Sequence, residues 1–229
     1  MAALIAAVTN IATAHTSIWS VGTSDKMNEK GKFLRKYKPN PSAPVRDVTD
    51  VALQCRAMDM SVPSESLPVV AGSDMIIHWH HFSDTDTDNV ISPSHRGPCI
   101  VYMAPLESNG QGYSWFKIYE KGYDVGRKLW CTDLLRENHG KLNVKVPTQI
   151  NNGEYLVRAE LFALHRAKDL GGAQFFPNCF QISVTGATYG SPELFAIPGI
   201  YSATDPGILY DRRKGEDNYI VPGPPVYSP

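Results

Sequence analysis

The chain has 229 residues, of which 42% are hydrophobic and 20% are charged, and its formal net charge is −1. This near-neutral balance, without a long basic run, argues against a nucleic acid as the main partner. Beyond the first residues no stretch is apolar enough for a membrane helix, and the length falls within the range of one all-β domain.

The first 14 residues carry no charged side chain and are rich in Ala, Ile, Leu and Val. They end in Ala12-Thr13-Ala14, which resembles an A-x-A cleavage signal. The segment is too short to span a bilayer, and it lacks the basic start of a full signal. We expect residues 1–14 to be a signal peptide with a truncated start, and residues 15–229 to be a secreted, extracellular domain. The alternative is a frayed apolar N-terminus or a first strand.

Six segments have the alternation and composition typical of β-strands and are bounded by turn residues. In chain order they are residues 74–82, 99–104, 113–120, 142–147, 154–165 and 174–185. The only convincing helix candidate is residues 128–137. Residues 187–229 are rich in Gly, Pro, Tyr and Asp, which indicates one long surface connection. The pattern favours a single β-sandwich with long loops, and loops on such a scaffold are where sites usually lie.

Two motifs suggest metal sites, but each has an ordinary explanation. His78 and His80 share one face of a strand, yet no third ligand stands at a matching spacing, so cross-strand packing is preferred. Residues 84–88, DTDTD, resemble the start of a calcium loop. Asn89 occupies the glycine position and His95 the position of the bidentate glutamate, so we interpret this run as a solvated acidic loop. Hydrolase and nucleotide-binding signatures are missing from the sequence.

Three stretches carry the remaining candidates. His15 follows the A-x-A signal, Ser94-His95-Arg96-Gly97-Pro98 precedes an expected strand, and His165 is followed by GGAQFF at residues 171–176. Alone, each has a structural explanation, because histidine is commonly intermediate in burial. A histidine at a free N-terminus, however, offers a metal two groups, its ring and its α-amine.

Together these stretches resemble a fungal, cellulose-active lytic polysaccharide monooxygenase of auxiliary activity family 9, formerly glycoside hydrolase family 61. The resemblance covers nearly the whole chain after residue 14. Its ordered motifs are SHRGPCIVYMAP (94–105), SNGQGYSWFKIYE (108–120), YLVRAELFALH (155–165), GGAQFFPNC (171–179), TDPGI (204–208) and YIVPGPPVY (219–227). It implies an all-β, immunoglobulin-like or fibronectin-like β-sandwich with long loops and a flat face that carries one copper ion.

The resemblance implies that His15 and His95 bind the copper. Cleavage would free the α-amine of His15 to chelate the metal together with its ring, and His95 would add a third nitrogen, a set that suits Cu(II). His165 and Gln174 match the catalytic residues beside the metal, where they would hydrogen-bond and orient the co-substrate. Phe176 matches the axial copper position, where most relatives carry a tyrosine, and it has no oxygen to offer.

The implied activity is oxidative cleavage of cellulose or a related β-1,4-glucan, with hydrogen abstraction at C1, C4 or both. It requires O2 or H2O2 as co-substrate and an external electron donor, either a small molecule or a redox protein. We expect a monomer. The second hypothesis is a non-catalytic, secreted copper- or carbohydrate-binding protein on the same scaffold.

Tyrosines near the end of the chain are the candidate substrate contacts, because an aromatic ring can stack on a sugar. These candidates are Tyr210 and Tyr219. Arg213 stands where relatives often carry the first of two surface tyrosines. The pair Arg212-Arg213 either favours hemicellulose or oligosaccharide contacts or is a solvated turn, and the turn is preferred.

Four cysteines in a secreted chain suggest disulfides. Cys55 and Cys179 match the common disulfide of the family, and its long loop would contribute about 4–5 kcal/mol in the chain-entropy model. Cys99 and Cys131 stand where relatives usually carry other residues. They either pair or stay buried as small apolar side chains.

Overall fold

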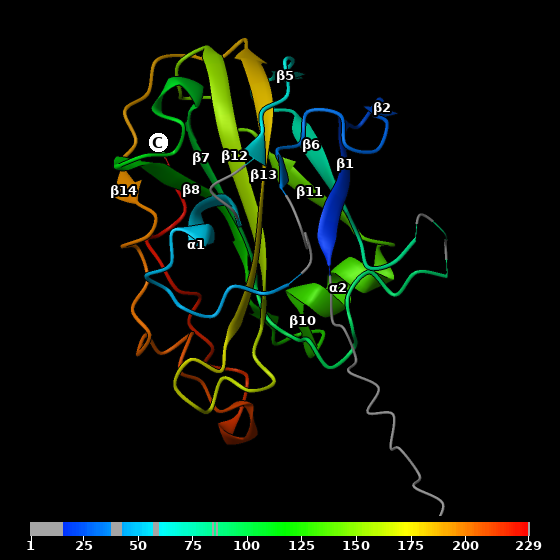
Figure 1. The fold of residues 1–229 in the computed structure, drawn as a ribbon, viewed down its shortest axis with the longest axis vertical. Helices are drawn as coiled ribbons and strands as arrows, with labels where there is room; N and C mark the ends of the chain where they lie inside the picture. Colours follow the sequence, from blue (N-terminus) through cyan, green and yellow to red (C-terminus); the bar gives the residue numbers. More distant parts are fainter. Residues whose placement is uncertain (1–15, 38–42, 57–59, 84, 86, 229) are drawn as a thin grey trace, which may run out of the picture.

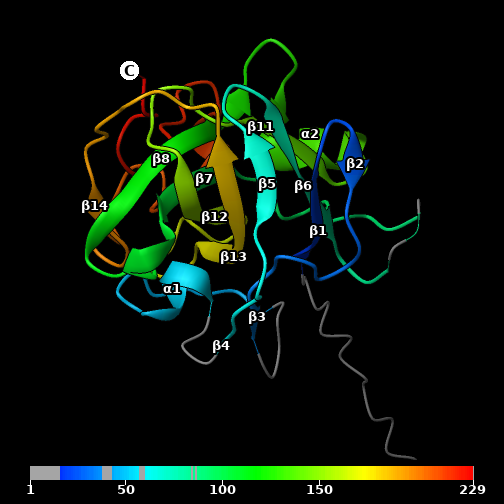
Figure 2. The same ribbon diagram turned by 90° about the horizontal axis from the view of Figure 1, so that it is seen from above.

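The computed structural model describes residues 16–37, 43–56, 60–83, 85 and 87–228. The proposed signal peptide and His15 lie outside the described residues. Most of the described strands form two sheets, which Figure 2 shows as two layers, with the smaller sheet beside the larger one. This confirms the expected all-β sandwich.

The smaller sheet has the strand order β11-β6-β1-β2, and all its pairs are antiparallel. Its strands are β11 (Lys141–Lys145), β6 (Asp74–His80), β1 (Ser17–Thr23) and β2 (Lys26–Met27). Along β6 the buried residues Met75, Ile77 and Trp79 alternate with half-buried ones. This period of two turns one face of the strand toward the other sheet.

The larger sheet has the strand order β14-β8-β7-β12-β13-β5. Its strands are β14 (Phe195–Ala196), β8 (Tyr113–Lys121), β7 (Cys99–Pro105), β12 (Gly153–Ala163), β13 (Gln174–Thr185) and β5 (Leu67–Val70). Only the β13–β5 pair is parallel. Strand β12 lies between β7 and β13 and is buried from Tyr155 to its end, as expected for a central strand covered on both faces (Figure 1).

Short elements complete the part of the chain that the structure describes. They are α1 (Ala52–Cys55), α2 (Cys131–Glu137), the 3-10 turns η1 (Leu106–Ser108) and η2 (Arg212–Lys214), and the short pairs β3 (Lys36–Tyr37) with β4 (Met60–Ser61) and β9 (Tyr123–Asp124) with β10 (Leu129–Trp130). No helix in the described ranges has both the length and the apolar character needed to cross a membrane.

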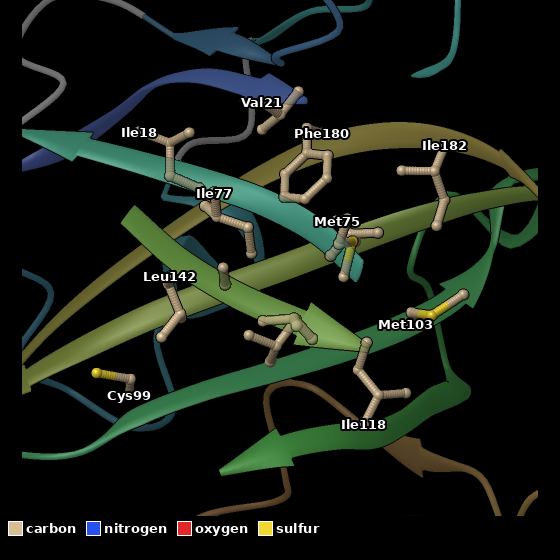
Figure 3. Packing of buried hydrophobic residues seen from close by; sticks show 14 of the residues in the cluster. Ile18, Val21, Met75, Ile77, Cys99, Met103, Ile118, Leu142, Phe180 and Ile182 are labelled. Atoms are coloured by element: carbon tan, nitrogen blue, oxygen red, sulfur yellow. The ribbon is translucent and has the colours of Figure 1, made fainter. Parts of the chain in front are cut away.

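The main hydrophobic core lies between the two sheets. Figure 3 shows Val21 and Ile77 of the smaller sheet packed near Met103, Phe180 and Ile182 of the larger one, and all five side chains are fully buried. A second core covers the opposite face of the larger sheet and is closed by α1 and the C-terminal segment. Both faces of the larger sheet are therefore buried from solvent.

The second core corrects the expectation that residues 187–229 form only a surface connection. Ile197, Tyr201 and Ile208 are at most 6% exposed and pack against the larger sheet. Apolar residues spaced irregularly along a Gly- and Pro-rich segment show no strand or helix period, so their burial left no pattern to detect.

The expected strands all occur, with ends shifted by a few residues. Strands β1 and β5 were not expected: β5 has only four residues, and β1 carries two serines and a glycine that weaken the strand signal. The expected helix begins three residues late, at Cys131 instead of Lys128. Lys128 has a φ of 55°, which is not helical, and Leu129–Trp130 form the short strand β10, so the helix can begin only after them.

Candidate active site

Three neighbouring strands bring the candidate residues to one end of the larger sheet. Because β12 runs antiparallel to β7 and β13, its end lies beside the starts of both: Leu161 pairs with Cys99, and Ala163 pairs with Gln174. His95 lies just before β7 and His165 just after β12. The loop between β12 and β13 is drawn in yellow at the lower end of Figure 1.

The loop that carries His95 is fixed directly on β12. Phe162 donates its backbone N–H to the carbonyl of Pro98 at 3.0 Å, and Leu164 donates to the carbonyl of Arg96 at 2.9 Å. At Gly97 the backbones approach so closely that an added Cβ would lie 2.3 Å from the Phe162 carbonyl oxygen. A side chain at position 97 would therefore push the loop away from the strand.

Helix α2 holds the same loop from the other side. Cys99 and Cys131 form a disulfide, which resolves the alternative that the sequence left open. Arg96 contacts the carboxylate of Asp133 at 3.2 Å, and the N–H of Gly97 donates to Thr132 Oγ1 at 3.1 Å. The backbone around His95 is thus anchored to β12, to α2 and through a covalent bond.

The ring of His95 is 6% exposed and faces two other candidates. Its centroid lies 4.3 Å from that of His165 and 6.3 Å from that of Phe176. The Oγ of Ser94 lies 3.0 Å from Nδ1 of His95, so this ring nitrogen has a hydrogen-bond partner. The structure therefore brings His95, His165 and Phe176 together, although 70 residues or more separate His95 from the others in sequence.

Electrostatics keep both imidazoles neutral. The pKa of His95 is lowered to about 4, chiefly by burial and next by the neighbouring His165, while a hydrogen bond with Gln174 acts in the opposite direction. Loss of solvent contact, followed by Arg166, Arg46 and Arg212, lowers the pKa of His165. A neutral imidazole retains a nitrogen lone pair, which is the form that binds a metal.

Gln174 and Phe176 lie two residues apart at the start of β13 and are both buried. Gln174 lies close enough to His95 for its side chain to hydrogen-bond the ring. Phe176 belongs to the core between the sheets, and the guanidinium of Arg56 lies 5.4 Å from the centre of its ring. Phe176 therefore presents a closed apolar surface beside the histidines and has no donor atom of its own.

Thr16 ties the start of the described chain to this cluster. Its buried side chain donates to the carbonyl of Val90 at 2.8 Å, and its own carbonyl accepts from Nη1 of Arg56 at 3.2 Å. Since Arg56 also covers Phe176, Thr16, the residue after His15, lies near the candidate residues. His15 itself is outside the described ranges.

The donor chemistry fits copper in part. His95 supplies one neutral nitrogen donor, and copper favours nitrogen ligands of this kind. Among the residues that the structure describes, no three His, Cys, Asp or Glu side chains gather to hold a metal. A complete ligand set therefore requires groups from outside these residues, and His15 offers two nitrogens.

A groove of about 510 Å³ opens beside His165. It is lined by Pro93, Ser94, Arg96, Leu164, His165, Lys168, Tyr210, Asp211, Arg212 and Arg213. Of the two candidate substrate contacts, Tyr210 lines this groove. Tyr219 instead packs 4.7 Å from the ring of Trp130, and its hydroxyl donates to the carbonyl of Gly207 at 2.8 Å.

The remaining sequence candidates lie elsewhere. The rings of His78 and His80 are 4.1 Å apart on β6, where His80 also packs 4.9 Å from Trp19 of the paired strand. In the acidic run Asp84 and Asp86 lie outside the described residues. Asp88 does not simply face solvent, because it accepts hydrogen bonds from four backbone N–H groups.

Sequence reasoning missed Thr16 and Arg56, which order the start of β1. Arg56 directly follows Cys55, and the Cys55–Cys179 disulfide fixes its backbone against β13. The position of Arg56 next to a disulfide cysteine was the one sequence feature that could have indicated this role. Nothing in the sequence indicated that the ring of Phe82 would be exposed. Its side chain is 65% exposed, and its ring stacks 3.4 Å from that of His81 just beyond β6.

Comparison with known proteins gives consistent matches along the chain. The sequence model of Auxiliary Activity family 9 (formerly GH61) matches residues 9–219. An Aspergillus niger protein named AA9 family lytic polysaccharide monooxygenase A is 40% identical over 98% of this chain and 55% of its own length. One from Emericella nidulans, named AA9 family lytic polysaccharide monooxygenase B, is 39% identical over 98% of this chain and 63% of its own length.

Solved structures agree with the fold. The structure of CvAA9A superposes with a TM-score of 0.85 at 32% identity, covering 93% of this chain and 98% of that chain. A cellulose-active polysaccharide monooxygenase from M. thermophila superposes with a TM-score of 0.73 at 26% identity, covering 93% and 99%. The chain thus matches these solved chains nearly end to end, whereas it spans 55% and 63% of the two fungal relatives above.

Proposed function

Because this chain belongs to Auxiliary Activity family 9, we propose that it is a copper-dependent monooxygenase that cleaves cellulose or a related β-1,4-glucan oxidatively, at C1, C4 or both. The observation that carries the proposal is the buried, neutral His95 packed 4.3 Å from His165 at the end of the larger sheet. Burying a polar ring such as that of His95 is costly unless its nitrogens have partners, and the exposed ring of His165 lies directly beside it.

His95 and His15 would hold the copper, His15 through its ring and, after cleavage behind Ala14, its α-amine. Bound copper, supplied with electrons by an external donor, provides the activation of O2 or H2O2 that an unassisted side chain cannot. The anchoring of Thr16 by Val90 and Arg56 supports this assignment, because it holds the neighbouring residue near His95.

His165 and Gln174 would position the co-substrate. The lowered pKa of His165 leaves its ring neutral, with one N–H to donate to an oxygen atom of the co-substrate. Gln174 would orient the ring of His95 through its side-chain amide. Groups of this kind typically change metal affinity or activity by ~10–100-fold.

Phe176 makes one side of the site apolar. Its ring is fully buried, so it excludes water from the position next to His95 and offers no phenol oxygen there. We propose that the nitrogen ligands suffice for copper binding, because the equatorial ligands dominate Cu(II) affinity in tetragonal sites.

The remaining parts of the proposal concern the whole protein. We propose that it is secreted, with residues 1–14 removed and residues 15–229 acting as one catalytic domain and as a monomer. The two disulfides support an oxidising compartment. Its partners would be the β-glucan and a small-molecule or redox-protein electron donor.

A second candidate function is a non-catalytic copper- or carbohydrate-binding protein. Phe176 favours this alternative, because its ring has no atom that could donate a hydrogen bond to a co-substrate or accept one from it. The copper-binding form of this alternative shares copper binding with the first function and differs from it in turnover, whereas the carbohydrate-binding form requires no copper.

The test is product analysis on amorphous cellulose with protein that begins at His15, one equivalent of Cu(II), and ascorbate. We expect oxidised oligosaccharides by mass spectrometry, and their loss without ascorbate or in His95→Ala. Copper binding without oxidised products would support the second function. If neither copper binding nor products were found, the monooxygenase and the copper-binding alternative would both be wrong.

A further inference from the structure

The groove beside His165 is basic, although the whole chain has a net charge of −1. Four of its lining residues are cationic, namely Arg96, Lys168, Arg212 and Arg213. Asp211 is the one carboxylate among the residues that line it. We call this set of lining residues the basic groove.

Arg212 is paired with Glu216 at 2.7 Å, but the other ion pairs leave a positive surplus in the basic groove. Asp133 is shared between Arg96, at 3.2 Å, and Arg136, at 2.6 Å, so one carboxylate serves two guanidinium groups. Arg213 contacts Asp211 at 2.7 Å, yet its side chain remains 75% exposed. A guanidinium has five N–H donors, and Arg213 can therefore bind a second carboxylate from solvent.

The remaining cations add to this surplus. Lys168 lies 3.8 Å from Asp169, and both side chains are more than half exposed, so this pair is weak. Arg46 and Arg166 are exposed, act on His165 from outside the basic groove, and form no ion pair within the described part of the chain. The positive field thus extends across His165.

We propose that the basic groove binds the carboxylate groups of an acidic polysaccharide, so that the preferred substrate is a β-1,4-linked chain bearing uronic acid or C6-carboxylate groups. The proposal rests on the proposed function for the cleavage of the backbone, but the binding itself needs no copper. Unmodified cellulose is neutral and carries no such carboxylate groups.

The chemistry of the lining residues matches such a ligand. Arginine binds carboxylates in a bidentate geometry, and lysine adds a mobile point charge. Tyr210 supplies apolar surface for the face of a sugar ring. Because His165 lines the same groove, a chain anchored there by its carboxylates would lie directly beside the candidate catalytic residues.

The experiment measures retention of copper-free protein on cellulose fibres oxidised at C6 to carboxylates, against the same fibres unmodified. We expect about tenfold tighter binding to the oxidised fibres at low ionic strength, and a smaller difference as salt screens the charges. The double variant Lys168→Gln/Arg213→Gln should lose roughly three- to tenfold affinity for oxidised fibres alone, since each exposed charge contributes modestly.

The matched control is Lys145→Gln, at the opposite end of the sandwich, where Lys145 pairs with Asp74 at 3.5 Å. It should bind both fibres as the unchanged protein does. The two groove side chains are 52% and 75% exposed, so the double variant should unfold at the same temperature as the unchanged protein.

Equal binding to both fibres, or equal loss in the control, would overturn the proposal. So would displacement by poly-L-glutamate as effective as that by polygalacturonate, because the groove would then be a general polyanion site. Since copper is absent throughout, these results are independent of turnover, and an inactive enzyme that still prefers oxidised fibres would leave this inference intact.

Discussion

Arg56 donates a hydrogen bond from Nη1 to the carbonyl of Thr16 at 3.2 Å. The same guanidinium lies 5.4 Å from the ring of Phe176, so one side chain links the start of β1 to β13. Its neighbour Cys55 is covalently joined to β13, which limits how far Arg56 can move. The residue after His15 is therefore held by a rigid contact near the candidate site.

Replacing Arg56 with Met should weaken copper binding. The substitution keeps an apolar stem over Phe176 but removes the donor to the carbonyl of Thr16, the residue that follows His15. We expect about a tenfold loss of Cu(II) affinity by isothermal titration, in line with other residues that orient metal ligands.

Arg35→Met serves as the control for this variant. Arg35 is 5% exposed and donates to Asn109 Oδ1 at 2.5 Å, away from the candidate site. Its loss should lower thermal stability and leave copper affinity unchanged. An equal loss of affinity in both variants would show that Arg56 acts only through general stability.

Phe176→Tyr should change the electronic environment of bound Cu(II) more than its affinity. The new phenol oxygen would be directed to the apolar side of the site, whereas the nitrogen ligands stay in place. We expect altered electron paramagnetic resonance parameters and an affinity within about threefold of the unchanged protein. A much larger change in affinity would mean that the axial position contributes to binding.

The sequence sufficed for the sandwich and for its longest strands because β12 and β13 are long, largely apolar runs bounded by glycine-containing turns. The cluster of His95, His165 and Gln174 could be anticipated only by resemblance, since their proximity depends on strand pairing across large separations. The covering role of residues 187–229 and the anchoring by Arg56 depend on packing in three dimensions. Neither leaves a periodic or spacing signal in the chain.

Glu160→Gln should destabilise the fold strongly. Glu160 and Arg158 form an ion pair on β12 with both side chains fully buried, and Tyr201 donates to the same carboxylate at 2.5 Å. Removing the negative charge leaves a buried guanidinium without its counter-ion, at a cost of about 3–5 kcal/mol. Urea denaturation measures the loss.

An exposed pair gives the comparison for this prediction. Arg127 contacts Glu137 at 2.7 Å, with both side chains more than half exposed. Glu137→Gln should cost at most about 1 kcal/mol, because solvent screens the pair. Similar losses for the two variants would contradict the role assigned to burial.

Asp88 should make the fold sensitive to acid. Partial burial raises the pKa of its carboxyl, but hydrogen bonds from the N–H groups of Ser83, His81, Phe82 and Val90 outweigh this and lower it overall. Because the folded pKa lies below the unfolded one, the stabilisation is complete above about pH 5 and disappears as the pH falls through the folded pKa.

The variant Asp88→Asn tests this effect. It should unfold more easily than the unchanged protein near neutral pH, and the difference should shrink in acid, as measured by thermal unfolding across a pH series. A constant difference from neutral pH into acid would show that the hydrogen bonds of Asp88 do not depend on its charge.

Removing the Cys99–Cys131 disulfide by a double change to Ala should cost about 3–4 kcal/mol of unfolding free energy in the chain-entropy model. The Cys55–Cys179 bond closes a longer loop, 124 against 32 residues, so its removal should cost more. Guanidinium denaturation of the two double variants compares them. The reverse order would indicate that local packing, not loop closure, dominates.

The chain on either side of the candidate metal site belongs to both layers of the sandwich: Thr16, which follows His15, leads into β1 of one sheet, and His95 leads into β7 of the other. A chain that has not yet joined its sheets cannot present both at once. If His15 and His95 bind Cu(II) as proposed, metal uptake and completion of the fold are coupled, and added Cu(II) should raise the melting temperature in proportion to the logarithm of its free concentration. Bound copper would then indicate that the two sheets had packed together correctly.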